Sequence, residues 1–156
     1  MNIRTGAKGA LLDEYERALS ELKQVISDVS PMELTLQVDK TTSDQNCVSI
    51  QSILTHVVYA GYTYANYIRK LKNAPFKLWE KAARSDIADY KNDLDQMFSY
   101  TIETFGFFTE EETMKPTNKI LTHWEQTYDI EQMWEHAIVH VLRHRRQIEK
   151  FKKIIK

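Results

Sequence analysis

The feature that most constrains the fold is a run from Ile130 to Ile155 that contains no glycine and no proline. Asp129 precedes this run and is a good N-cap, and Gln132 can reach back to the amide of the cap to complete a capping box. Several lysines close the run, where cations suit the negative end of the helix dipole. The pattern predicts one helix of about seven turns.

The rest of the chain is also typical of helices, because only 4 Gly and 3 Pro occur and alternating strand-like runs are nearly absent. Apolar spacing predicts three further helices, at residues 8–27, 50–71 and 85–106, the latter two capped by Ser49 and Ser85. We expect Pro31 to end the first helix and the alternating Leu34, Leu36 and Val38 to be extended. The sequence therefore predicts an all-α fold, a four-helix bundle formed by residues 1–156 as a single domain.

Composition narrows the class of protein. The formal net charge of −1 provides no general field for nucleic acid or for an anionic membrane surface. The sequence contains a single cysteine, Cys47, so no internal disulfide can form and a reducing compartment is expected. The first residues lack a signal-peptide core, and no stretch approaches the roughly 20 apolar residues of a membrane span. We expect a soluble, cytoplasmic protein that does not bind membranes or nucleic acid.

The last predicted helix carries three of the 5 histidines, His136, His140 and His144. Helical geometry places His144 about 35°, His140 about 75° and His136 about 115° from the centre of the apolar stripe. His144 should therefore point into the core and His140 should lie at its margin. Because they are four residues apart, His140 and His144 can share one metal ion, although a single core histidine is more often simply hydrogen-bonded.

A third ligand would decide between these interpretations, and His56 on the second predicted helix is the candidate. A di-iron bundle needs Glu-x-x-His pairs, which are absent, as is His-Glu-x-x-His. One cysteine cannot build a cysteine-rich zinc site. What remains is a set of imidazoles from His56, His140 and His144, which leaves a coordination position open for water or substrate, as in catalytic sites.

Two segments resemble the signatures of a known family. SIQSILTHVV at residues 49–58 and HVLRHRRQI at residues 140–148 are similar to the two motifs of the DinB-like (DinB/YfiT) superfamily. The resemblance implies an up-down-down-up four-helix bundle that is commonly a homodimer. It also implies a divalent metal, with zinc, nickel or manganese as candidates, held by His56, His140 and His144.

The chain departs from the family pattern in two places. Arg143 stands before the second ligand of the last helix, where relatives often carry a further histidine, and this difference can change the pocket. His136 extends the histidine series and could replace His140 if the helix were rotated, which the helical angles disfavour.

The resemblance also implies a function, that of a metal-dependent thiol transferase. In such enzymes a low-molecular-weight thiol attacks a small electrophilic substrate, and the metal lowers the pKa of the thiol. Two alternatives remain open. One is a metal-dependent hydrolase that uses the same three ligands, and the other is a non-catalytic bundle that binds a metal or small ligand in a stress response.

Aromatic residues could form a pocket at the open side of the metal. The candidates by position are Tyr59, Tyr62, Trp79 and Trp124, with His136 as a further one. Each ring could equally belong to the core. The sequence shows no obvious general base, and it assigns no role to His123.

Arginines of the last helix raise a nucleic-acid alternative. Arg143, Arg145 and Arg146 splay around the helix, and no DNA-reading motif accompanies them. We expect them to pair with nearby glutamates or to remain solvated.

Overall fold

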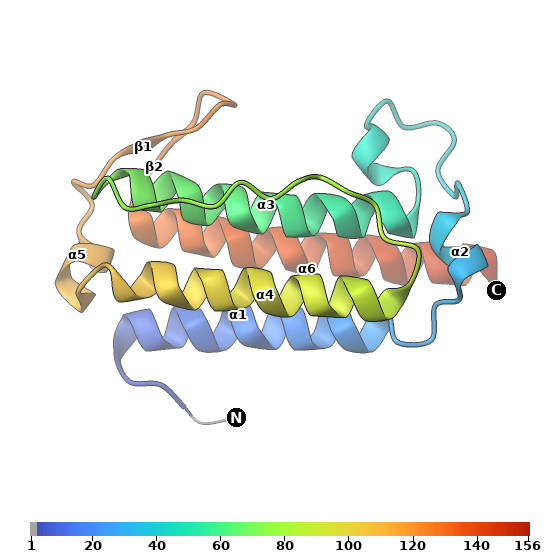
Figure 1. Ribbon diagram of the computed structural model, residues 1–156, viewed down its shortest axis with the longest axis horizontal. Coiled ribbons are helices and arrows are strands. Elements are labelled where there is room, and N and C mark those ends of the chain that lie inside the picture. The colour runs from blue at the N-terminus through green and yellow to red at the C-terminus, as the bar shows by residue number, and fades with distance from the viewer. Residues whose placement is uncertain (1–2) are drawn as a thin grey trace.

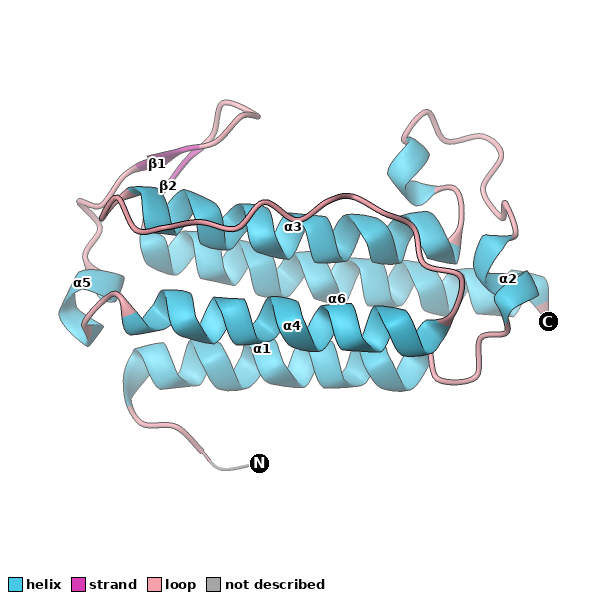
Figure 2. Ribbon diagram, viewed as in Figure 1, coloured by secondary structure: helices cyan, strands magenta, loops and turns pink. Residues whose placement is uncertain are grey.

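A computed structural model describes residues 3–156, and most of these residues are helical. The regular elements are α1 Gly6–Val25, α2 Pro31–Thr35, the 3₁₀ turn η1 Gln45–Cys47, α3 Ile50–Lys70, α4 Ile87–Gly106, α5 Glu110–Met114, β1 Ile120–Leu121, β2 Thr127–Tyr128 and α6 Ile130–Ile155. Figure 2 shows that the four long helices make up the body of the molecule and that the strands form one small hairpin. The prediction of an all-α fold is confirmed.

The long helices lie side by side (Figure 1). The helix α1 packs on α4 and α6, and α3 packs on the same two helices. The chain from the end of α3 runs back along that helix before α4 begins, so α3 and α4 start at the same end of the molecule (Figure 1). Apolar side chains of all four helices fill the core, where Trp134 stacks on Phe105 with ring centroids 4.3 Å apart. Burial of these apolar side chains is the main stabilising contribution to the fold.

Local hydrogen bonds fix where two of the long helices begin. The Asp129 carboxylate accepts from the Gln132 amide at 2.8 Å, and the Asp129 amide donates to Gln132 Oε1 at 3.0 Å. Ser49 and Ser52 form the same reciprocal pair at the start of α3. The predicted capping box of α6 and the Ser49 cap are therefore confirmed, and both helices begin at the predicted residue.

Other predicted boundaries were wrong. The first helix lies two residues earlier than the predicted range of 8–27, and Asp86, not Ser85, caps α4. Pro31 does not end the first helix, since α1 ends at Val25. It occupies the first turn of α2, where its missing N–H is not needed. Part of the predicted extended piece is consequently helical.

The connection at residues 107–128 contains α5 and the hairpin, which pairs Ile120 with Tyr128 and Leu121 with Thr127. Glu125 at the turn has a φ of 63°, in the left-handed region. Among residues 3–156, no helix has both the length and the apolar character to cross a bilayer.

Candidate metal centre

Three histidines from two packed helices meet in the molecule. His56 lies on the second turn of α3, and His140 and His144 are one turn apart on α6. The Nε2 atom of His140 lies 2.9 Å from His56 Nε2 and 3.2 Å from His144 Nε2. One ligand nitrogen from each of the three rings lies within 4.8 Å of the others. The three imidazoles are thus close enough to bind one metal ion.

The geometry suits a cation better than it suits hydrogen bonds. A neutral ring nitrogen either donates or accepts, so His140 Nε2 cannot donate to one neighbour while it accepts from the other. Neighbouring nitrogens that share a metal at 2.0–2.1 Å lie about 2.8–3.4 Å apart in octahedral or tetrahedral sites. The separations of His140 Nε2 from its two neighbours, 2.9 and 3.2 Å, fall within that range, and the three nitrogens together lie within 4.8 Å of one another. One cation would accept a lone pair from every ring.

Gln147 prepares His144 for this role. The Nδ1–H group of His144 donates to Gln147 Oε1 at 3.0 Å, one turn further along α6. A proton on Nδ1 leaves the Nε2 lone pair free and fixes the plane of the ring. Metal-binding histidines in proteins usually have such a partner on their other nitrogen.

Burial keeps the three rings neutral. Loss of solvent, together with a smaller effect of the neighbouring His144, lowers the pKa of His56 from 6.5 to about 4. Burial is also the main cause that lowers the pKa of His140 and that of His144. Neutral imidazoles are the form that binds metals, so protons compete weakly for this site near neutral pH.

The burial order of the two histidines on α6 differs from the prediction. His140 is only 8% exposed, whereas His144 is half-buried. The helical angles were measured from one apolar stripe, but α6 packs on both α1 and α3. Tyr64 of α3 lies edge-on against His140, with ring centroids 5.5 Å apart, and covers it from solvent.

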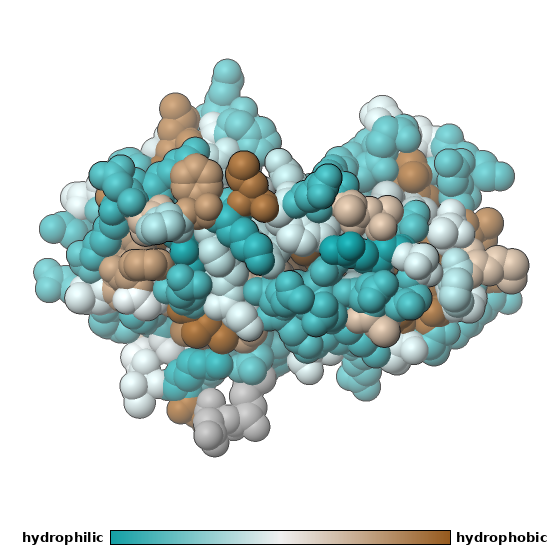
Figure 3. Space-filling view, viewed as in Figure 1, coloured by the Kyte–Doolittle hydropathy of each residue, from teal (hydrophilic) through white to brown (hydrophobic). Residues whose placement is uncertain are grey.

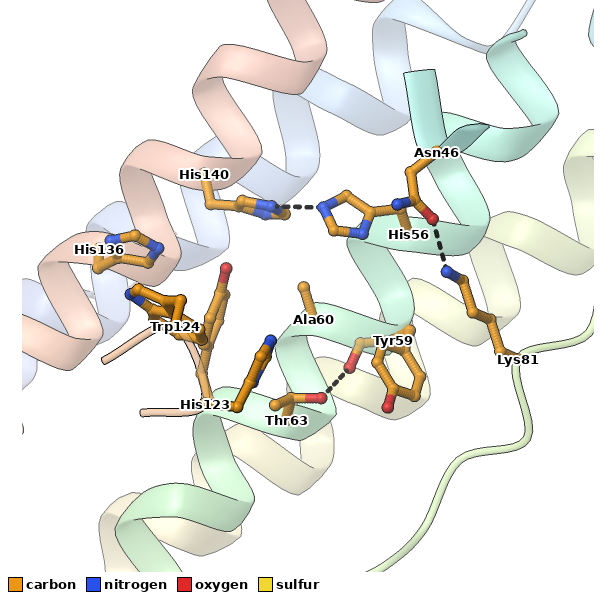
Figure 4. Close-up of a pocket in the computed structure, with 11 residues that line it drawn as sticks. Asn46, His56, Tyr59, Ala60, Thr63, Lys81, His123, Trp124, His136 and His140 are labelled. Carbon is orange, nitrogen blue, oxygen red and sulfur yellow. Dashed lines mark hydrogen bonds between the residues drawn. The ribbon is translucent and has the colours of Figure 1, made fainter. Parts of the chain in front are cut away.

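A cavity of about 470 Å³ opens beside the histidines. The residues that line it are Asn46, His56, Tyr59, Ala60, Thr63, Tyr64, Lys81, His123, Trp124, His136 and His140. They come from α3, α6, the hairpin, η1 and the segment before α4, and the outline of the molecule is notched between the hairpin and the η1 region (Figure 3). In Figure 4, His56 and His140 face one another across one end of the cavity. The volume lies within the usual range for small-molecule sites, roughly 300–1,000 Å³.

The predicted pocket residues divide into two groups. Tyr59, Trp124 and His136 line the cavity. Tyr62 and Trp79 do not, because they stack on each other with ring centroids 6.2 Å apart, and Tyr62 borders a separate hollow. Sequence proximity to His56 did not reveal that Tyr62 points to another face of α3.

Other lining residues were not among the candidates. Ala60, Thr63 and Tyr64 follow His56 at helical spacing, so a projection of α3 centred on His56 could have identified them. Lys81 and Asn46 belong to irregular segments, for which the sequence gives no such signal.

The tip of the hairpin is fixed by Tyr67 of α3. The backbone N–H of His123 donates to the Tyr67 hydroxyl oxygen at 2.8 Å, which leaves the hydroxyl proton to donate to His123 Nδ1, also at 2.8 Å. In this arrangement Nε2 carries the proton of a neutral His123 ring. His123 thus offers an N–H donor at the cavity wall.

The three arginines of α6 differ in their surroundings. Arg145 pairs with Glu21 of α1 and lies 3.5 Å from Glu149, as expected from the nearby glutamates. Arg143 and Arg146 are exposed.

Comparison with known proteins gives no family assignment. A scan against protein-family models finds no match for this chain, and a search of curated proteins finds no significant match.

Proposed function

We propose that this protein is a DinB-like metal-dependent thiol transferase that acts on small electrophiles. The observation that carries the proposal is the convergence of the His56, His140 and His144 ring nitrogens beside a cavity. Three neutral ligands leave a coordination position for an exogenous group, which is the arrangement of catalytic rather than structural sites. The motifs at residues 49–58 and 140–148 support the same proposal.

The proposal includes the family topology. The four long helices would form the up-down-down-up bundle of DinB-like proteins, and the protein would act as a homodimer in the cytoplasm. The ring of contacts among α1, α4, α3 and α6 and the long return segment between α3 and α4 support this topology.

The chain's own residues would hold and orient the reacting groups. His56, His140 and His144 would bind zinc, nickel or manganese, and a divalent cation there would lower the pKa of a coordinated thiol or water. Gln147 fixes the His144 ring, and aromatic side chains form part of the cavity wall. His123 can donate its Nε2–H to a substrate.

A thiol fits the cavity better than a hydrolytic water does. No carboxylate from residues 3–156 lines the cavity, so the carboxylate general base of many hydrolytic metal sites is missing. A thiol, with a pKa near 8.5, needs much less help to ionise than water, with a pKa of 15.7. We therefore favour thiol transfer over hydrolysis. The third alternative is a bundle that only binds a metal or ligand, and the experiment below distinguishes it from a thiol transferase.

The test uses cobalt as a spectroscopic metal. Cobalt-substituted protein is mixed in turn with cysteine, glutathione and coenzyme A, and we expect at least one thiol to produce a sulfur-to-cobalt charge-transfer band. That thiol should then react with 1-chloro-2,4-dinitrobenzene faster in the presence of zinc-loaded protein than with the His140→Ala variant. Absence of both the band and the rate increase with every thiol would overturn thiol transfer and leave the binding-only alternative.

A further inference from the structure

The charges around the cavity are unbalanced. Lys81 is the one lining residue with a formal charge, and no lining residue is acidic. Its Nζ donates to Asn46 Oδ1 at 2.5 Å and lies over the Tyr59 ring at 5.5 Å from the centroid (Figure 4). Within residues 3–156, Lys81 forms no ion pair, whereas several other basic residues pair with carboxylates. A lysine directed at a cavity and lacking a carboxylate partner is a candidate anion site.

Asp44, two residues before Asn46, is an acidic residue that is already engaged. The Asp44 carboxylate accepts from the backbone amide and the side-chain amide of Asn46, both at 2.9 Å, and from the Cys47 thiol at 3.5 Å. It does not line the cavity. Lys81 is therefore the charged side chain of the cavity wall, with no acidic lining residue to balance it.

A metal would increase this imbalance. The three candidate ligands are neutral imidazoles, so the full charge of a divalent cation would remain uncompensated by the protein. Many metal sites include a carboxylate ligand that offsets part of that charge, whereas the three candidate ligands here are all histidines. The field in the cavity would then favour an anionic ligand and disfavour a cationic one.

The aromatic walls of the cavity determine which shape of ligand fits it best. The Trp124 ring stacks on His136 with centroids 5.7 Å apart and meets Tyr64 edge-on at 6.2 Å. Tyr59 forms another part of the wall and is 41% exposed. Flat aromatic surfaces of this kind favour planar, apolar groups.

We propose that the cavity binds a small carboxylate whose flat, apolar body lies against the aromatic wall of the cavity and whose carboxylate pairs with Lys81. This inference rests on the proposed function only in placing the metal centre in the same cavity. It specifies the substrate class of that centre as an aromatic or similarly planar monocarboxylate.

The test compares benzoate with benzamide, a neutral molecule of nearly the same shape. Dissociation constants are measured by ligand-observed NMR titration for the wild type, for Lys81→Met and for Lys77→Met. Lys77 is the matched control, because it lies in the same irregular segment and over a tyrosine ring, that of Tyr62, but lines the separate hollow. An exposed ion pair stabilises by up to about 1 kcal/mol, so wild type and Lys77→Met should prefer benzoate by roughly three- to fivefold. Lys81→Met should lose this preference when the protein is free of metal.

The titrations are made on zinc-loaded protein and again after treatment with a chelator. The contribution of Lys81 should appear in both, since the variant removes only the ammonium group. In the chelated protein, equal binding of benzoate and benzamide by the wild type, or a preference that survives in Lys81→Met, would overturn the inference. A protein that takes up no zinc yet shows the Lys81-dependent preference would refute the metal centre while supporting the carboxylate site.

Discussion

At the residue scale, the site depends on which nitrogen of each imidazole carries the proton. His144 is the clearest case, because Gln147 Oε1 accepts from its Nδ1 and leaves Nε2 directed at His140. Gln147 belongs to the second of the two motifs, so the same short sequence contains two ligands and the residue that orients one of them.

We therefore expect Gln147→Leu to weaken metal binding without removing a ligand. Loss of the partner on the other nitrogen of a metal-binding histidine commonly costs about 10- to 100-fold in affinity. Competition with a chromophoric chelator measures this change. Gln147→Glu is the control, because it keeps an oxygen acceptor at the same place and should retain tight binding. Equal affinity of Gln147→Leu and the wild type would show that His144 does not need this hydrogen bond.

At the element scale, α3 is held between α4 and α6, and it carries His56. Its approach to α4 depends on Gly61, where a Cβ atom would overlap the side chain of Met97. Met97 is fully buried, and its sulfur contacts the Tyr15 hydroxyl at 3.7 Å, so it has little room to move. A small residue at this position lets the two helices pack closely.

Gly61→Ala should consequently destabilise the fold by about 1–3 kcal/mol, even though alanine is the better helix former. Gly106→Ala is the matched control at the end of α4, since nothing lies within 4 Å of the position that the new methyl group would take and the φ of Gly106 is not in the left-handed region. Urea denaturation followed by circular dichroism measures both free energies of unfolding. If Gly61→Ala were as stable as Gly106→Ala, the close approach of α3 to α4 would be refuted.

The same scale shows how much of the fold the sequence could predict. Caps and apolar spacing are local, so the starts of α3 and α6 and the all-α class were predicted correctly. The prediction for Pro31 was wrong because proline is common both just after a helix ends and in the first turn of the next helix. The hairpin was missed because its strands are only two residues long.

The candidate site was harder to predict from the sequence than the helices were. Spacing on one helix brought His140 and His144 together, and His56 followed by elimination and lies beside them. The places of Lys81 and His123 depend on contacts between distant segments, such as the bond between His123 and Tyr67. No periodicity in one sequence encodes such contacts.

At the scale of the whole molecule, the cavity is built where the irregular segments meet the helices. The η1 turn, the segment before α4 and the hairpin all contribute residues around α3. A metal on His56, His140 and His144 would also link α3 to α6, and a ligand that binds only the folded chain stabilises it. Metal binding is therefore the property on which both the proposed chemistry and this link depend.

The most direct measurement is the metal content of protein purified without a metal-affinity tag, determined by elemental mass spectrometry. We predict about one zinc, nickel or manganese ion per chain, lost in His56→Ala and in His144→Ala, because three ligands are the usual minimum for such a site. His136→Ala should keep its metal, since His136 stacks on Trp124 outside the group of three. A wild-type protein that contains no metal and cannot be loaded with any of the three ions would contradict the central claim.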